Sequence, residues 1–161
     1  MITVRRPIAL DMPDMARLLN EIIAQGGTTA LTRPVTGADL TEWMQFAPDR
    51  NVWHVAVDAQ DKVVGFQWIE PDKDMSEDVA GIATFVQFGQ TGLGIGSKLF
   101  DATRKAAKAL GYVWINANIR ADNEGGLIYY QSRGFQDYGV IEGYELANGD
   151  IVDKRLKRYD L

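Results

Sequence analysis

Glycine alternates with other residues in the stretch GQTGLGIGSKLF, residues 89–100, where Gly92, Gly94 and Gly96 precede a run with a helical pattern. Backbone N–H groups at the start of a helix attract anions, because they are unpaired and lie at the positive end of the helix dipole. Glycines carry no side chain and let a phosphate approach the backbone closely. The stretch therefore predicts a site for a phosphate-bearing ligand, although a plain glycine-rich turn between strand and helix has the same composition.

Two common phosphate-binding motifs fit this stretch poorly. A P-loop requires Gly-Lys-Ser/Thr after a four-residue spacer, whereas residues 96–98 read GSK. A dinucleotide fingerprint requires a third Gly or Ala, but counting from Gly92 gives Ser97 and counting from Gly94 gives Leu99. Binding of a nucleoside triphosphate is therefore disfavoured, and a fragment of an NAD-binding oxidoreductase is a poor alternative.

A third motif fits better. Residues 91–100, TGLGIGSKLF, resemble the (Arg/Gln)-x-x-Gly-x-Gly/Ala loop of the GNAT superfamily of N-acetyltransferases, with Gly94 and Gly96 on its glycines. Residues 123–135, NEGGLIYYQSRGF, are similar to a second pattern of that family: Asn, a small residue three positions later, Tyr seven later and Gly-Phe eleven and twelve later. The two motifs occur in the family's order, and the resemblance covers roughly residues 50–136.

The resemblance implies acetyl transfer from acetyl-CoA to the primary amine of a small molecule, either amino-acid-like or a polyamine. The segments LNEIIAQGGTTALTRP and NGDIVD look like the phosphinothricin-acetyltransferase-like branch, which favours a small acceptor. A non-catalytic acyl-CoA-binding or regulatory module of the same fold is the alternative. The resemblance implies that coenzyme A contacts Val86, Gln87, Phe88, Thr91, Gly92, Leu93, Gly94, Ile95, Gly96, Ser97, Lys98, Asn123 and Tyr130.

Acetyl transfer requires an oriented thioester, a deprotonated amine, donors for the carbonyl oxygen and a proton for the departing thiolate. By resemblance, the backbone N–H near Val86 serves the carbonyl oxygen, and Tyr130 occupies the general-acid position. A phenol with a pKa of about 10 stays protonated at neutral pH. Neighbouring helical residues point about 100° apart, so we expect Tyr130 rather than Tyr129 to face the thioester.

Two departures from the family pattern concern the loop and the proton acceptor. Thr91 stands where the loop usually begins with Arg or Gln, and Gly81 stands where the phosphinothricin-acetyltransferase-like branch commonly has Glu. The usual base is therefore absent. The proton acceptor is left open among Glu70, Glu77, Asp78 and a chain of water molecules; His54, which alternates with Val and Trp in a strand-like run, is interpreted as structural.

The acceptor side of the site is expected to come from segments that flank the family's cleft. Glu21, Thr28, Trp43 and Trp68 are the candidates. A carboxylate could hold the ammonium group of the acceptor, and an indole could contact the acceptor's aliphatic stem or its charge. A position in the hydrophobic core is the alternative for the two tryptophans.

The periodicity of the chain predicts the elements that position these residues. Met15, Leu18 and Ile22 mark a helix face between Asp11 and Gly26. A strand, a crossover helix and a strand make a central parallel pair in an otherwise antiparallel sheet. The expected elements are a short first strand, that helix, a second helix ended by Pro48, a hairpin over 51–71, a strand over 79–88, a helix over 97–110, a strand over 112–119, a helix over 123–134, and a hairpin over 135–159 turning at Asn148-Gly149.

This pattern predicts an α+β fold: a GNAT-like mixed, mostly antiparallel sheet with a central splayed parallel strand pair and about four helices, formed by residues 1–161 as one domain. A 46% hydrophobic composition supplies a core, and the net charge of −5 argues against nucleic acid or an anionic membrane as partner. With no cysteine and one histidine we expect no metal site, and without a signal-like segment a cytoplasmic protein. The family resemblance also implies a homodimer.

Overall fold

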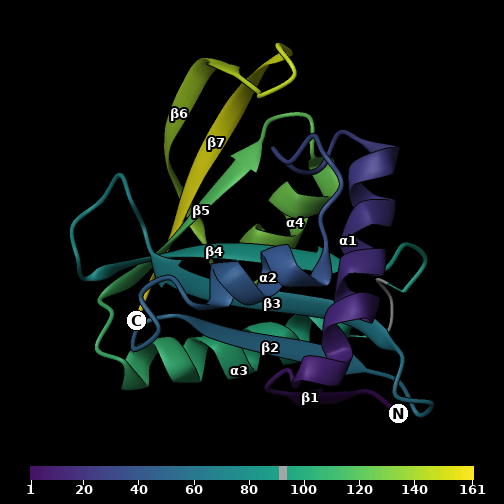
Figure 1. Ribbon diagram of the computed structural model, residues 1–161. Coiled ribbons are helices and arrows are strands. Elements are labelled where there is room, and N and C mark those ends of the chain that lie inside the picture. The colour runs from purple at the N-terminus through teal and green to yellow at the C-terminus, as the bar shows by residue number, and fades with distance from the viewer. Residues whose placement is uncertain (91–93) are drawn as a thin grey trace.

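A single seven-stranded sheet, in the order β1-β2-β3-β4-β5-β7-β6, forms the centre of the molecule (Figure 1). The computed structural model describes residues 1–90 and 94–161. The strands are β1 (Thr3–Arg5), β2 (Val52–Val57), β3 (Val63–Pro71), β4 (Val79–Val86), β5 (Trp114–Arg120), β6 (Gln136–Glu145) and β7 (Ile151–Asp160), and the helices are η1 (Ala9–Asp11), α1 (Met12–Gln25), α2 (Gly37–Met44), α3 (Ile95–Ala109) and α4 (Glu124–Ser132).

The strand pairing confirms the predicted fold class. Five of the six described pairings are antiparallel, and β4 and β5 form the parallel pair that the crossover helix required. Helices α1 and α2 cover one face of the sheet, whereas α3 lies behind β2 and β3 in Figure 1. Among the described residues, no helix has the length and apolar character needed to cross a membrane.

Helix α1 buries the predicted apolar face, with Met15, Leu18 and Ile22 in the core. Asp11 lies at its start but does not cap α1 with its side chain. Its carboxylate instead accepts hydrogen bonds from the Ile8 N–H (2.7 Å) and from the Arg5 guanidinium (2.7 and 3.0 Å). The hydrogen bond from Arg5 is the main cause that lowers the pKa of Asp11.

Helix α2 is the predicted second helix, and it ends at Met44, before Pro48. It starts at Gly37 because Thr36 and Asp39 form a capping box: Thr36 Oγ1 accepts from the Asp39 N–H (3.1 Å), and the Asp39 carboxylate accepts from the Thr36 N–H (2.8 Å). The short length of α2 leaves the polar segment 26–35 free to cross from α1 over the sheet.

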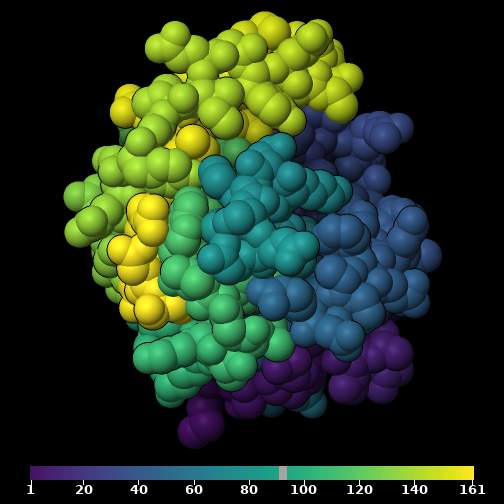
Figure 2. All heavy atoms as spheres, turned by 90° about the vertical axis from the view of Figure 1, so that its left-hand side faces the viewer, coloured from purple at the N-terminus to yellow at the C-terminus, as the bar shows by residue number. Residues whose placement is uncertain are grey.

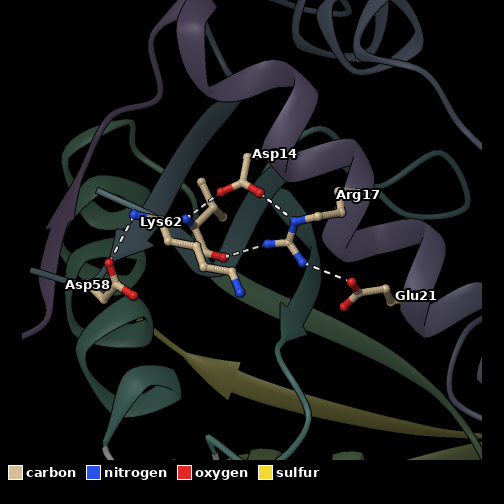
Figure 3. A network of polar contacts seen from close by, with 6 residues as sticks. Asp14, Arg17, Glu21, Asp58 and Lys62 are labelled. Atoms are coloured by element: carbon tan, nitrogen blue, oxygen red, sulfur yellow. Dashed lines mark hydrogen bonds and ion pairs between the residues drawn. The ribbon is translucent and has the colours of Figure 1, made fainter. Parts of the chain in front are cut away.

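Helix α1 is fastened to the start of β3 by one polar network (Figure 3). Asp14 Oδ2 accepts from the Val63 N–H (2.7 Å), while Arg17 donates to the Val63 carbonyl (3.2 Å) and to Asp14 (2.5 Å). Glu21 extends the network by accepting from Arg17 at 3.0 Å. Both backbone groups of Val63 are thereby satisfied by the helix, which fixes how α1 lies on the sheet.

Strands β4 and β5 pair only at their beginnings. Their register runs Val79–Trp114, Ala80–Ile115 and Gly81–Asn116, and no further pair joins them in the described chain. From there β5 continues alongside β7 to Arg120. In Figure 1 the two strands diverge, with α4 behind the opening. The divergence leaves one edge of β4 without a neighbouring strand, which is where the candidate site lies.

Candidate active site

A cavity of about 810 Å³ opens between the diverging strands. Its walls come from β4, the start of α3, β5, α4 and the segment that follows α1. Of the residues predicted from the sequence, Val86, Phe88, Gly94, Gly96, Ser97, Asn123, Tyr130 and Thr28 line it. The predictions for Thr91, Gly92 and Leu93 fall outside the described residues.

The backbone of β4 presents hydrogen-bonding groups to the cavity. The Gln87 N–H donates to the Val64 carbonyl of β3 (2.9 Å), and Val86 pairs with Gly65 in the same ladder. Alternate residues of an antiparallel strand direct their N–H groups to opposite edges. The N–H of Val86 is therefore directed away from β3, toward the opening, which is the orientation its predicted role requires.

The start of α3 is shaped by Gly94, Ile95 and Gly96. Gly94 has φ +72°, a left-handed conformation that side chains other than glycine rarely adopt, and Ile95 opens the helix behind it with its own side chain fully buried. A Cβ at Gly96 would lie 2.6 Å from Cε1 of Tyr129. The two glycines are needed for different reasons. Gly94 permits the left-handed turn, and Gly96 leaves room for the ring of Tyr129. The first N–H groups of the helix face a space that can take an anion.

Two adjacent phenols contact the same polar chain behind β4. The hydroxyls of Tyr130 and Thr84 share a hydrogen bond of 2.7 Å. Gln67 Nε2 donates both to Thr84 Oγ1 (2.8 Å) and to the Tyr129 hydroxyl (3.0 Å), which itself donates to the Gly96 carbonyl (2.7 Å). Both rings line the cavity, so Tyr129, which the helical spacing directed elsewhere, belongs to the site as well.

Burial controls the protonation of these phenols. It raises the pKa of Tyr129 to about 12 and raises the pKa of Tyr130 further, because desolvation disfavours a phenolate. Tyr130 is 7% exposed. Both hydroxyls are therefore protonated at neutral pH. That of Tyr129 donates to the Gly96 carbonyl, whereas that of Tyr130 can donate into the cavity when Thr84 Oγ1 donates to it.

Asn123 caps α4. Its Oδ1 accepts from the Gly126 N–H (3.0 Å), and its Nδ2 donates to the Thr28 carbonyl (3.2 Å). A Cβ at Gly126 would collide with Nδ2 of Asn123. The spacing of Asn and a small residue three positions later thus has a steric cause, and the same side chain joins α4 to the segment after α1.

The comparisons with known proteins agree with this geometry. Residues 48–137 match the family described as acetyltransferase (GNAT) domain. The chain belongs to the GNAT family. The predicted GNAT fold and the predicted acetyltransferase class are confirmed at the level of the family.

Relatives of this GNAT protein extend over its whole length. YwnH of Bacillus subtilis (strain 168), named provisionally as a phosphinothricin acetyltransferase, is 27% identical over 99% of this chain and 94% of its own. A GNAT phosphinothricin acetyltransferase of Sinorhizobium meliloti, solved with acetyl-CoA, has a TM-score of 0.88 at 18% identity and covers 99% of this chain and 88% of its own. The yncA protein of Salmonella typhimurium, also solved with acetyl-CoA, has a TM-score of 0.88 at 16% identity, with coverages of 99% and 94%.

Lys98 and Arg133 lie beside the start of α3. Both line a second, shallower hollow of about 440 Å³. Lys98 Nζ is 3.5 Å from the Ile2 carbonyl, a long contact that leaves the ammonium group available. Arg133, which sequence reasoning missed, donates to Ser97 Oγ and lines the main cavity too. Its position directly before the Gly-Phe pair of the second motif is the signal that could have identified it.

The acceptor residues predicted from the sequence are divided between cavity and core. Thr28 lines the cavity. Glu21 pairs with Arg17 on α1, and Trp43 and Trp68 lie in the core, where their ring centroids are 6.0 Å apart. None of these three is among the described residues that line the cavity.

Besides Arg133, two further cations that the sequence did not identify line the cavity. Arg120 on β5 donates to the Thr29 carbonyl (3.1 Å) and pairs with Asp122 (2.8 Å). Lys154 on β7 is 8% exposed, with its Nζ 3.5 Å from the centre of the Tyr144 ring, and burial lowers its pKa. Among the described lining residues there is no Asp or Glu.

The candidate bases lie away from the cavity wall. Glu70 accepts from the Trp68 indole (3.2 Å), and Asp78 accepts from Ser76 Oγ (2.5 Å) in the loop that also holds Glu77. His54 is buried, and desolvation lowers its pKa to about 4. Within residues 1–90 and 94–161, no cluster of three His, Asp or Glu side chains could hold a metal ion.

Proposed function

We propose that this GNAT protein transfers the acetyl group of acetyl-CoA to the primary amine of a small molecule that also carries an anionic group, as an amino acid does. The observation that carries the proposal is the composition of one cavity. It is lined by the glycine-capped start of α3, two protonated phenols and three cations, with no described carboxylate. This composition favours an amino-acid-like acceptor over a polyamine.

The donor half of the cavity fits coenzyme A. The free N–H groups at the start of α3, with Ser97 and Arg133 beside them, would hold the pyrophosphate. The unpaired edge of β4 would pair with the pantetheine amides as a neighbouring strand would, ending at the N–H of Val86. Bound there, acetyl-CoA supplies a thioester whose carbonyl oxygen can be stabilised by that N–H.

The acceptor half fits an anion next to an amine. Lys154 has no described carboxylate partner, and its buried stem holds the ammonium group at the cavity wall. Arg120 is held in place by Thr29 and Asp122. A carboxylate bound between such cations would present the acceptor's amine to the thioester, whereas the second ammonium group of a polyamine would be repelled.

The reaction needs two proton transfers by the protein. An ammonium group that becomes an amide loses two protons, one of which ends on the sulfur when the carbon–sulfur bond breaks and the carbon–nitrogen bond has formed. Tyr130 is proposed to donate to that sulfur, because its hydroxyl lines the cavity and stays protonated. Thr84 Oγ1, bonded to it at 2.7 Å, fixes the direction of the hydroxyl.

The test is release of free coenzyme A thiol with a panel of amino acids, their sulfoxide and sulfone analogues, and polyamines. The absence of cysteine keeps the background low. Turnover with amino-acid-like acceptors, lowered by roughly 10²-fold or more in Tyr130→Phe, would support both the reaction and the acid. Acetyl-CoA that raises the melting temperature without turnover on any acceptor would favour the alternative of a binding module.

We further propose that two copies associate through the β6–β7 hairpin. Strand β6 is at the edge of the sheet, and Tyr138, Val140, Tyr144 and Ile151 are 40%, 51%, 41% and 62% exposed. Apolar side chains on an unpaired edge favour contact with a second copy. Sedimentation of the wild type and of Val140→Lys measures this: a dimer that dissociates in the variant supports it, and a monomeric wild type contradicts it.

A further inference from the structure

The side chain of Asp72 occupies the space that a side chain at position 81 would need. A Cβ at Gly81 would lie 3.3 Å from Oδ2 of Asp72, 3.7 Å from its Cβ and 3.8 Å from its Cα. Asp72 belongs to the turn directly after β3, where its N–H donates to the Val79 carbonyl (3.1 Å). The carboxylate of Asp72, which follows β3, therefore lies over Gly81 of β4, where there is no side chain.

The Asp72 carboxylate is held by a backbone group of its own turn and by a hydrogen-bond chain from two other strands. Asn116 Nδ2 on β5 donates to Asp72 Oδ2 (2.8 Å), and the Tyr138 hydroxyl on β6 donates to Asn116 Oδ1 (2.5 Å). The Asp74 N–H donates to Asp72 Oδ1 (3.0 Å). Figure 2 shows the teal loop that contains these aspartates at the centre of its face, beside the yellow-green strand β6. Oδ2 of Asp72 is thus oriented by a chain of hydrogen bonds from Asn116 on β5 and Tyr138 on β6.

The strand register indicates how far the Asp72 carboxylate lies from the cavity. Gly81 and Asn116 are the last residues at which β4 and β5 pair. Two residues further along each strand, on the same face, Ala83 and Asn118 line the cavity. At about 3.3 Å per residue, Oδ2 of Asp72 is roughly 7 Å from these lining residues, a gap that a chain of about two hydrogen-bonded water molecules can span.

We propose that Asp72 is the proton acceptor for the acceptor amine, acting through a chain of water molecules that begins at the point where β4 and β5 diverge. This inference rests on the function proposed above. Of the two protons that an ammonium group loses on becoming an amide, one would pass through these water molecules to Oδ2 of Asp72 and then to solvent, and the other would end on the sulfur. Gly81 leaves room for the Asp72 carboxylate because it has no side chain, and any side chain at position 81 would contact Asp72.

Glu70 is the nearest competitor, since it pairs with Gly81 across the β3–β4 ladder. Its carboxylate, however, accepts from the Trp68 indole of its own strand (3.2 Å). That contact directs Glu70 along β3, whereas Asn116 directs Asp72 toward β5 and the opening. The matched variant Glu70→Gln therefore serves as the control for the loss of a carboxylate at the same level of the sheet.

Charged and titratable groups surround Asp72 on every element packed against it. Glu70 on β3 and Asp74 in the same loop are negative, whereas Arg158 on β7, opposite Asn116, is positive. Tyr138 on β6 is kept neutral because burial, and then the charge of Asp72, raise its pKa. The isosteric change Asp72→Asn retains an oxygen for the Asp74 N–H, but it removes the negative charge and the oxygen that accepts from Asn116 Nδ2.

The experiment compares pH profiles of kcat/KM for the wild type, Asp72→Asn and Glu70→Gln, using the amino acid that the panel identifies as acceptor. At pH 7 we expect Asp72→Asn to lose roughly 10²-fold in kcat/KM, with an unchanged dissociation constant for acetyl-CoA. The loss should shrink about tenfold per pH unit as the pH approaches the pKa of the amine, because the acceptor then arrives deprotonated. A merely structural role would leave the loss independent of pH.

The outcomes separate this inference from the proposed function. Wild-type turnover with an Asp72→Asn profile parallel to that of the wild type would overturn the role of Asp72 alone, as would a larger loss in Glu70→Gln. No wild-type turnover with any acceptor would overturn the proposed function and this inference together. The double variant Asp72→Ala, Gly81→Glu returns a carboxylate to the space that Asp72 vacates. A kcat/KM tenfold or more above that of Asp72→Ala would support the inference.

Discussion

The ring of Tyr129 lies directly against Gly96, so a Cβ at position 96 would be 2.6 Å from Cε1 of the tyrosine. The tyrosine hydroxyl also donates to the Gly96 carbonyl at 2.7 Å. The start of α3 and the middle of α4 are thus joined by one residue pair, through both a packing contact and a hydrogen bond. This pair determines where the first N–H groups of α3 stand relative to the phenols.

We expect Gly96→Ala to displace this pair. Overpacking of a close contact costs about 1–3 kcal/mol, and part of that cost should appear as weaker binding of acetyl-CoA, because the helix start would move. A thermal-shift titration with acetyl-CoA measures both effects. Gly125→Ala on α4 is the matched control, since a Cβ there has only the Asn123 side chain at 3.9 Å. Equal behaviour of the two variants would show that the Tyr129 contact is unimportant.

The two hydrogen bonds of Asn123 can be separated by two substitutions. Asn123→Ala removes the cap of α4 and should lower the free energy of unfolding by about 1 kcal/mol. Asn123→Asp keeps an oxygen for the Gly126 N–H but loses the donor to the Thr28 carbonyl. It should therefore keep most of the stability while raising the KM of the acceptor several-fold. Urea unfolding and acceptor kinetics decide between these results, and an Asp variant as unstable as the Ala variant would contradict them.

Much of the fold was predictable because it depends on local periodicity. The stripe of Met15, Leu18 and Ile22 required a helix, and a parallel pair of strands required a crossover. The site was predictable where a motif has a local cause, as with the cap from Asn123 to Gly126. These features involve residues close together in the chain.

The remaining site residues depend on contacts between distant segments. Lys154 reaches the cavity through the register of β7 with β5 and through the irregular pairing of β6 near Ile141. Asp72 reaches Gly81 only because a turn folds back onto β4. Neither relationship leaves a periodic signal in the sequence, so neither residue was a candidate before the structure placed it.

His54 makes the stability of the fold depend on pH. Its pKa is lowered from 6.5 to about 4, first by burial and then by the charge of Arg6, so the folded state prefers the neutral ring. The unfolded chain binds more protons between these values, and stability must therefore be fully present above pH 6.5 and fall as the pH drops toward 4. The full shift corresponds to roughly 3 kcal/mol, which partial access of solvent reduces to about 1–2 kcal/mol.

Urea unfolding at pH 7.5 and pH 5 measures this dependence. The midpoint of the wild type should be lower at pH 5, and the difference should be smaller in His54→Gln, which cannot acquire a charge. The carboxylate of Asp11 does not contribute to this difference, because Arg5 is the main cause that lowers its pKa and it titrates below the pH range of the experiment. An equal decrease in both proteins would assign the effect to other groups.

Lys154 should determine which acceptors bind without taking part in the chemistry. The ammonium group lines the cavity, and a charge-assisted hydrogen bond to an acceptor carboxylate contributes about 1.5–3 kcal/mol. In Lys154→Gln we therefore expect the KM of an amino acid acceptor to rise roughly tenfold or more at nearly unchanged kcat, since a kcat/KM ratio of ten corresponds to about 1.4 kcal/mol. Repeating the measurement with the corresponding amino acid amide removes the acceptor's charge, so the amide should show a high KM in both proteins. If the variant raised the KM of acid and amide equally, the lysine would be a packing residue on the Tyr144 ring and the acceptor would not require an anionic group.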